Sequence, residues 1–173
     1  MSTSVALLAD NGATKSDGKE YSSVLGDTND RRLISGYIVF LGLTPISWSS
    51  RKQPIVSRSS TEAEYRAVAS TLSETNWITR FLKHLNVPLS TAPIMRCDNF
   101  GVTYIAENPV HHTKSKHLEV DLHFVHHQIR NGLVIVSHIH SNDQIADLLT
   151  KTFSKVAFQR MLPKLGVLSL HLT

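Results

Sequence analysis

The hydrophobic period of the chain changes at Ser60, and this change limits the fold more than any other feature of the sequence. Before it, the runs "GYIVFLG" (36–42), "PISWSS" (45–50) and "PIVS" (54–57) are short and rich in β-branched and aromatic residues. From Ser60 to about Asn86 the apolar positions advance by three or four residues, which is typical of a long helix that ends before Pro88. The sequence therefore predicts neighbouring strands joined by tight connections, followed by one long helix.

The stripe that defines this helix and the later elements follow from the same patterns. Its members are Ala63, Ala67, Ser70, Glu74, Trp77, Phe81 and Leu85, widened by Leu72, Ile78 and Leu82. Beyond the helix we expect strands at 93–97 and 133–139, and helices at 100–107, 116–130, 143–151 and 155–164. Strands in hairpins followed by α, β, α, β, α indicate a mixed α/β sheet in which antiparallel strands lead into parallel crossover units.

Length, cysteine content and charge restrict the class of protein. A chain of 173 residues with 41% hydrophobic residues is long enough to bury the core of one domain. The single Cys97 rules out an internal disulfide, and residues 1–20 lack the pattern of a signal peptide or a membrane span, so we expect the cytoplasm or the nucleus. A net charge of +4 is compatible with a polyanionic partner such as nucleic acid.

Two glutamates lie at the start of the long helix, in "SRSSTEAEYRAVAS" (57–70). Ser59, Ser60 and Thr61 are suitable N-cap residues, and a carboxylate in the first turn is favoured by the helix dipole, so either glutamate has a purely structural explanation. Residues two apart on a helix point about 200° apart. At most one of Glu62 and Glu64 can therefore face a functional site.

Two aspartates are further candidates. Asp98 follows the strand "PIMRC", and the crevice beyond the carboxyl ends of strands is where sites form in open α/β sheets; the alternative is a plain N-cap residue. Asp147 lies in "NDQIADLLTK" beside an apolar helix face, where a carboxylate is usually a solvated charge. If the topology brings these groups together with a helix-start glutamate, their mutual repulsion calls for a divalent cation, and oxygen ligands suit Mg²⁺ or Mn²⁺.

Four long motifs resemble one family in the right order. They are "GDTNDRRLISGYIVFLG", "ISWSSRKQPIVSRSSTEAEYRAVAS", "CDNFGVTYIAENPVHHTKSKHLEVDLHFV" and "NDQIADLLTKTFS", between about Gly26 and Gly166. Together they resemble the ribonuclease H domain of copia-type long-terminal-repeat retrotransposon Pol polyproteins. The resemblance implies a ribonuclease H-like fold with a five-stranded mixed sheet flanked by helices. It also implies Glu64, Asp98 and Asp147 as the catalytic and metal-binding acids, with Mg²⁺ or Mn²⁺ as the cofactor.

Residues 1–20 contain one short apolar run and then a stretch rich in Gly, Ser, Lys and Asp, which predicts a poorly defined N-terminal segment. The resemblance then implies the ribonuclease H-like domain at 21–166, followed by a C-terminal tail at 167–173, and it also implies the partner. The implied activity is hydrolysis of the RNA strand of RNA:DNA hybrids, in a domain originally fused to a reverse transcriptase. No membrane partner is implied, and the oligomeric state stays open.

The chain departs from the family pattern at the first catalytic motif. In "EYSSVLGD", Tyr21 and Ser23 stand where the family has acids, so the metal ligand of the first strand is missing. Two nearby aspartates are candidate replacements: Asp27, on the turn-like stretch "GDTND", and Asp10, which the family pattern does not support. Because the ligand shared by two metals sets their spacing, its loss predicts weak or absent cleavage. The family's Gln-Ser after Asp98-Asn99 is replaced here by Phe100-Gly101, which changes the expected substrate contacts.

Basic and hydroxyl residues before the long helix are candidates for binding a hybrid, because such duplexes are recognised through backbone and sugar. The candidates are Arg51, Lys52, Gln53, Ser57, Arg58 and Ser59. The alternative is a solvated turn.

Ten histidines also raise the question of a zinc site. His123 and His127 are four apart on a predicted helix, and His138 and His140 alternate along a predicted strand, so both pairs are feasible zinc ligands. The lack of a Cys-x-x-Cys motif favours surface or packed histidines instead.

Three functions compete for the chain as a whole: a working Mg²⁺-dependent nuclease, a catalytically inactive nucleic-acid-binding domain, and a transposon fragment without a present function.

Overall fold

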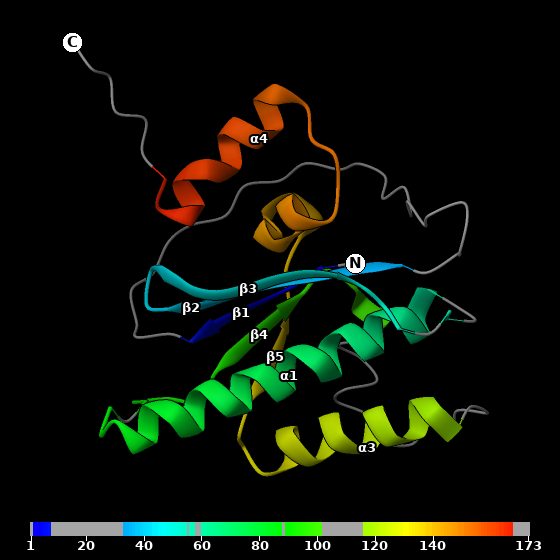
Figure 1. Ribbon diagram of the computed structural model, residues 1–173, viewed down its shortest axis with the longest axis vertical. Helices are drawn as coiled ribbons and strands as arrows, with labels where there is room; N and C mark the ends of the chain where they lie inside the picture. The colour runs from blue at the N-terminus through cyan, green and yellow to red at the C-terminus, as the bar shows by residue number, and fades with distance from the viewer. Residues whose placement is uncertain are drawn as a thin grey trace.

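A computed structural model describes residues 2–7, 33–54, 56–57, 60–87, 89–101 and 116–167. They form a mixed sheet of five strands in the order β3-β2-β1-β4-β5. The long helices α1 (Ser60–His84) and α3 (Lys116–Arg130) cover one face of the sheet, while α4 (Lys155–Met161) lies beyond the other (Figure 1). The predicted α/β class is therefore confirmed.

The strands differ in their pairing. β2 (Ile34–Leu41) and β3 (Thr44–Lys52) form an antiparallel hairpin, and β4 (Ile94–Cys97) pairs in parallel with β5 (Ile135–His138). Between these two pairs lies β1 (Ser2–Leu7), which runs parallel to β2 and antiparallel to β4. The centre of the sheet is thus formed by the N-terminal segment that the sequence placed outside the domain.

The strand predicted at 54–57 is wrong. Pro54, Val56 and Ser57 lie outside the sheet, because the chain turns away after Lys52 and Gln53 is held inside. The Gln53 amide donates a hydrogen bond of 2.7 Å to the carbonyl of Ala63 on α1, and its backbone N–H donates to the carbonyl of Leu33. Gln53 therefore ties the end of β3 to α1, and its proposed contact with nucleic acid is replaced by a structural role.

Two residues of the β2–β3 hairpin suit its geometry, a glycine with positive φ in the loop and a proline on the edge strand. Gly42 has a φ of 63° in the loop between the strands, a conformation that costs glycine little. Pro45 lies on β3, an edge strand, where its missing N–H is tolerated, and the register shifts there between Val39 and Phe40. The hairpin therefore ends the sheet on this side.

The helix α1 begins at Ser60 and ends near Asn86, as predicted. Its first turn carries Glu62 and its last turn carries Lys83 and His84, charges that complement the helix dipole. Asn86 has a φ of 57°, the left-handed conformation that commonly ends a helix. The N–H of Val87 then donates to the carbonyl of Leu82, which satisfies one of the last carbonyls of α1.

The buried stripe of α1 is rotated relative to the predicted one. Val68, Leu72 and Ile78 are buried, whereas Trp77 and Phe81 are about half exposed or more. The sequence contains two adjacent apolar stripes, and the smaller residues of one of them fit closely against the sheet. The aromatic pair is left on the surface.

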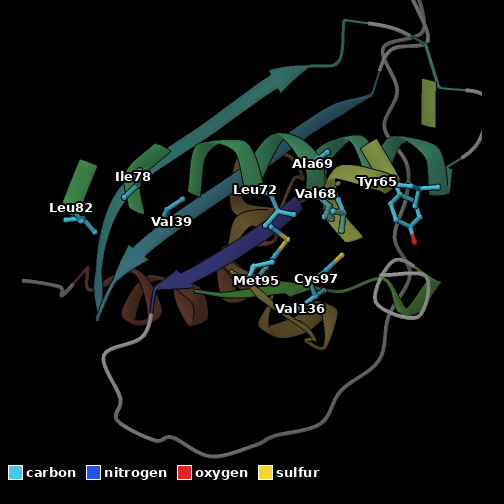
Figure 2. Close-up of a cluster of buried hydrophobic side chains, with 13 residues drawn as sticks. Val39, Tyr65, Val68, Ala69, Leu72, Ile78, Leu82, Met95, Cys97 and Val136 are labelled. Atoms are coloured by element: carbon cyan, nitrogen blue, oxygen red, sulfur yellow. The ribbon is translucent and has the colours of Figure 1, made fainter. Parts of the chain in front are cut away.

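The main core lies between the sheet and the two long helices (Figure 2). Its buried members are Val39, Tyr65, Val68, Ala69, Leu72, Ile78, Leu82, Met95, Cys97, Leu122, Val125, Val134 and Val136. A second cluster of Ile38, Phe40 and Ala146 lies on the opposite face of the sheet. Both faces are therefore covered.

The C-terminal elements differ in part from expectation. The helix predicted at 143–151 is two short 3₁₀ segments, η1 (Ser141–Asp143) and η2 (Ile145–Leu149), because the fully buried Gln144 between them has extended backbone angles. α4 is followed by the 3₁₀ segment η3 (Leu162–Leu165).

The helix expected at 100–107 lies largely outside the described residues. None of the helices in the described part of the chain is long and apolar enough to cross a membrane.

Candidate functional site

Glu64 lies in the first part of α1 with its side chain half-buried. Burial, followed by the negative charge of Asp98, raises the pKa of this carboxyl from 4.5 to about 7. Lys151 and a hydrogen bond from the Asn99 side chain act in the opposite direction. Glu64 is therefore partly protonated near neutral pH and lies within electrostatic reach of Asp98.

Asp98 directly follows β4, at the carboxyl end of that strand. The neighbouring Cys97 is buried, and burial raises the pKa of its thiol to about 12, with Asp98, Glu64 and Asp147 all adding to the rise. The hydroxyl of Tyr65 lies 3.4 Å from the carbonyl oxygen of Gly101 and donates to it, which connects α1 to the segment after β4. All three predicted acids therefore lie close enough to Cys97 to raise the pKa of its thiol.

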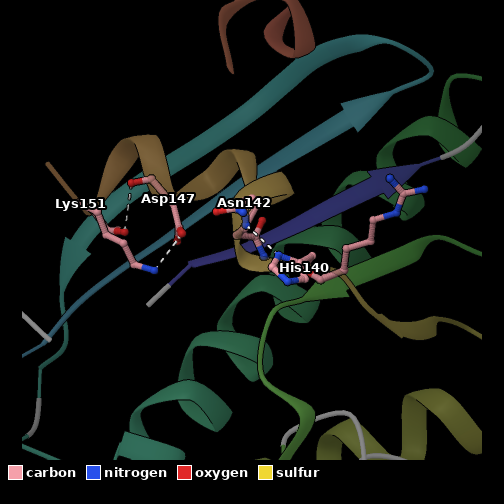
Figure 3. Close-up of polar contacts among 7 residues, drawn as sticks. His140, Asn142, Asp147 and Lys151 are labelled. Atoms are coloured by element: carbon pink, nitrogen blue, oxygen red, sulfur yellow. Dashed lines mark hydrogen bonds and ion pairs between the residues drawn. The ribbon is translucent and has the colours of Figure 1, made fainter. Parts of the chain in front are cut away.

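Asp147 lies in η2 and is almost fully buried. Its Oδ2 accepts a hydrogen bond of 2.8 Å from the Nζ of Lys151, and Figure 3 shows this ion pair beside η1. A buried carboxylate needs such a partner, because desolvation of an unpaired charge costs several kcal/mol. Lys151 thus neutralises the third acid of the site.

Glu62 faces a different part of the molecule. Its Oε1 accepts a hydrogen bond of 2.7 Å from the Nη2 of Arg66, one turn along α1. Both groups act electrostatically on Asp121 of α3, whose pKa is raised chiefly by burial. Glu62 therefore belongs to a charged contact between α1 and α3, whereas Glu64 lies near Asp98.

The central strand carries no acid. β1 has the sequence STSVAL, with Thr3 opposite Cys97 and Ala6 opposite Ile94. Because β1 is antiparallel to β4, the chain leaves this strand at the end of the sheet opposite to Asp98. The residues discussed for the missing ligand lie outside the described part of the chain: Asp10, Tyr21, Ser23 and Asp27.

Two observations bear on whether a divalent cation fits. The Oε2 atom of Glu64 is buried without a hydrogen-bond partner, as expected of a ligand oxygen that awaits a cation. Within the described ranges, however, no three His, Cys, Asp or Glu side chains lie close enough together to hold a metal ion. Mg²⁺ often uses one or two carboxylates and keeps several waters. Glu64 and Asp98 are therefore the two carboxylates that remain as candidate ligands, because Asp147 is paired with Lys151.

The candidates for nucleic-acid binding occupy different environments. Arg51 and Lys52 are exposed at the end of β3. Ser57 is half-buried, and its hydroxyl donates a hydrogen bond of 3.0 Å to the Oε1 of Gln53. Arg58 and Ser59 lie outside the described residues. The two basic residues of β3 are therefore the accessible ones among those described.

The histidine pairs do not form a zinc site in the part of the chain that the structure describes. His123 lies 3.8 Å from Glu119 on α3 with its side chain largely exposed. The His138 ring stacks on Phe100 with ring centroids 3.6 Å apart, and the Nδ1 of His140 accepts a weak hydrogen bond from the N–H of Asn142. These histidines have separate local partners.

Sequence reasoning missed Lys151 and Asn99 as members of the site. Lys151 follows Asp147 by four residues, which is the spacing of an ion pair on one helix face and was a readable signal. Asn99 had no comparable signal, because its contact with Glu64 depends on how β4 packs beneath α1.

Comparisons with known proteins give a consistent answer. The chain is 52% identical over 143 residues to the Retrovirus-related Pol polyprotein from transposon RE2 of Arabidopsis thaliana, covering 83% of this chain and 10% of that protein. It is 50% identical over 142 residues to the corresponding polyprotein from transposon RE1 of the same species, with 82% and 10% covered. The polyprotein from transposon TNT 1-94 of Nicotiana tabacum is 30% identical over 138 residues, with 80% and 10% covered.

The chain spans about a tenth of the length of each of these relatives. No protein-family model and no solved structure matches it. Over most of its length, the chain is therefore a homologue of one short part of retrovirus-related transposon Pol polyproteins.

Proposed function

We propose that the chain is a ribonuclease H-like domain derived from a copia-type Pol polyprotein, and that it binds RNA:DNA hybrids with little or no cleavage. The observation that carries the proposal is the electrostatic coupling of Glu64 to Asp98 at the carboxyl end of β4. The four family motifs and the homology to transposon Pol polyproteins support the same assignment.

The retained residues suit hydrolysis of a phosphodiester. Glu64 has a pKa of about 7 in the absence of a cation, and a divalent cation beside it would favour the ionised carboxylate that serves as a ligand. Burial and the charge of Asp98 are the main causes of that pKa, and the Asn99 side chain donates a hydrogen bond that holds the carboxylate. Glu64 and Asp98 would hold a Mg²⁺ or Mn²⁺ ion, which supplies Lewis-acid stabilisation of charge on the phosphate.

Two features argue that cleavage is impaired. β1, at the centre of the sheet, contains no carboxylate, so the described residues offer no ligand from the first strand. Asp147 is paired with Lys151. Loss of one electrostatic contact to a transition state commonly costs about 10² to 10³ in rate. An inactive binding domain therefore accounts for these features better than a working nuclease.

Binding is tested by fluorescence anisotropy with a labelled blunt RNA:DNA hybrid at several salt concentrations. We expect the affinity to fall steeply with salt, because the basic side chains of the protein displace counterions from the phosphates when the hybrid binds. Lys52→Ala should make the slope of log K against log salt shallower by about one, because Lys52 is exposed on β3 and does not line the cavity described below. Lys155→Ala is the matched control, because this exposed lysine lies on α4 and not on β3.

Two outcomes would contradict the proposal. One is a lack of binding at low salt, which would favour a fragment without a present function. The other is binding whose affinity does not change with salt, since contacts to phosphates require such a change.

A further inference from the structure

Trp77 and Phe81 form an aromatic surface on α1 that the core does not use. Trp77 is 60% exposed and Phe81 is 49% exposed. Their rings are nearly parallel, with an interplanar angle of 3° and centroids 5.4 Å apart. Phe81 therefore fixes the orientation of Trp77 while leaving much of the indole accessible.

Trp77 also forms one wall of a cavity of about 370 Å³ between α1 and the start of β2 and end of β3. The other residues that line the cavity include Tyr37, Arg51, Glu74 and several serines. One Glu74 oxygen already accepts a hydrogen bond of 3.1 Å from Ser47, which holds the carboxylate in place. The lining residues thus combine two aromatic side chains, one cation, one carboxylate and several hydroxyl groups.

The strand register places this cavity on the same edge of the sheet as Asp98. Cys97 pairs with Thr3, Thr3 pairs with Tyr37, and Tyr37 pairs with Ser49, so one row crosses from β4 to β3. With strands about 4.8 Å apart, three steps along this row span about 14 Å. The cavity and the Glu64–Asp98 pair are therefore separated by only a few nucleotides of an extended strand.

The chemistry of the walls matches a single nucleotide of RNA. An unpaired base stacks on an exposed indole with a gain of about 1 to 3 kcal/mol, and a guanidinium suits a phosphate. Glu74 repels further phosphates, but together with the serine hydroxyls it can bond to a ribose 2′-hydroxyl, the group that distinguishes RNA from DNA. A base paired within a duplex cannot stack on Trp77 in this way.

We propose that the cavity at Trp77 and Arg51 binds single-stranded RNA that continues from a hybrid held near Glu64 and Asp98. This inference rests on the proposed function, since it assumes that a hybrid binds near those acids. It adds a second contact site, in which Trp77 stacks a base, Arg51 contacts a phosphate, and Glu74 faces the ribose.

The test compares three kinds of labelled ligand by fluorescence anisotropy. They are a blunt RNA:DNA hybrid, hybrids whose RNA strand extends about six nucleotides beyond one end or the other, and hybrids with DNA extensions of the same sequence at the same ends. We expect an RNA extension at one end to tighten binding at least about fivefold, with a smaller gain for DNA. Trp77→Leu should remove this gain and leave blunt-hybrid binding unchanged. Trp48→Leu is the matched control, because Trp48 is 63% exposed but lies on β3 outside the cavity.

Tryptophan fluorescence supplies a second readout, because the chain has two tryptophans. In Trp48→Phe, which retains Trp77, the RNA extension should quench the emission, whereas in Trp77→Phe it should not. Equal affinities for blunt and extended hybrids would overturn the inference while leaving the proposed function intact. An equal gain from DNA extensions would overturn the assignment to RNA. Lack of binding to every ligand would refute both proposals.

Discussion

Replacing Glu64 by glutamine should change how the stability of the protein depends on pH. Glutamine keeps the shape of the side chain but cannot ionise. In the wild type, burial and Asp98 raise the pKa of Glu64 from 4.5 to about 7, so ionisation is less favourable in the folded protein than in the unfolded chain. The contribution of Glu64 to stability is therefore fully present below about pH 4.5 and is lost as the pH rises to about 7.

The magnitude follows from the two pKa values. A rise from 4.5 to about 7 corresponds to a loss of about 3 kcal/mol once the carboxyl is ionised in both states. Between about pH 5 and pH 8, the wild type should lose about 2.5 kcal/mol relative to Glu64→Gln. The difference between the two proteins removes the contributions of other titrating groups.

Urea unfolding followed by tryptophan fluorescence at these two pH values measures the free energy of unfolding. Glu119→Gln is the matched control, because Glu119 is largely exposed on α3 and should show no comparable change. If wild type and Glu64→Gln kept the same stability difference at both pH values, the coupling of Glu64 to its buried surroundings and to Asp98 would be refuted.

Two further predictions concern the surroundings of η2. Lys151→Met should lower the free energy of unfolding by about 3 kcal/mol, because the buried Asp147 loses its partner; a loss below about 1 kcal/mol in urea unfolding would contradict this. Gly36→Ala should cost about 1 to 3 kcal/mol, because a Cβ would lie 2.7 Å from the Cγ2 of Thr150. Thr150→Ser removes that methyl group and should restore part of the loss in the double variant, whereas additive losses would show that the contact is not the cause.

The elements with local signals could be predicted from the sequence. The bounds of α1 follow from hydroxyl residues before it and Asn86 after it, and α3 follows from its apolar period. The separation of Glu62 from Glu64 was also predictable from helix geometry, and Arg66, four residues after Glu62, reinforces it.

The elements that depend on distant contacts could not be predicted. β1 is one short run whose place is decided by pairing with β2 and β4, both far along the chain. The choice between the two apolar stripes of α1 depends on the fit to the sheet, so hydrophobicity alone placed Trp77 and Phe81 in the wrong stripe. The burial of the Asp147 carboxylate likewise depends on how η2 packs against the sheet, whereas its partner Lys151 was readable from the spacing of four residues.

The central claim is that the chain binds a hybrid through a site that has lost most of its catalytic power. The most direct measurement follows one labelled RNA:DNA hybrid in Mg²⁺ and, separately, in Mn²⁺, with binding and cleavage recorded on the same samples. We predict salt-dependent binding and RNA cleavage that is absent or at least about 100-fold slower than that of a ribonuclease H with all its acids. Rapid Mg²⁺-dependent cleavage that Glu64→Gln abolishes would contradict the claim.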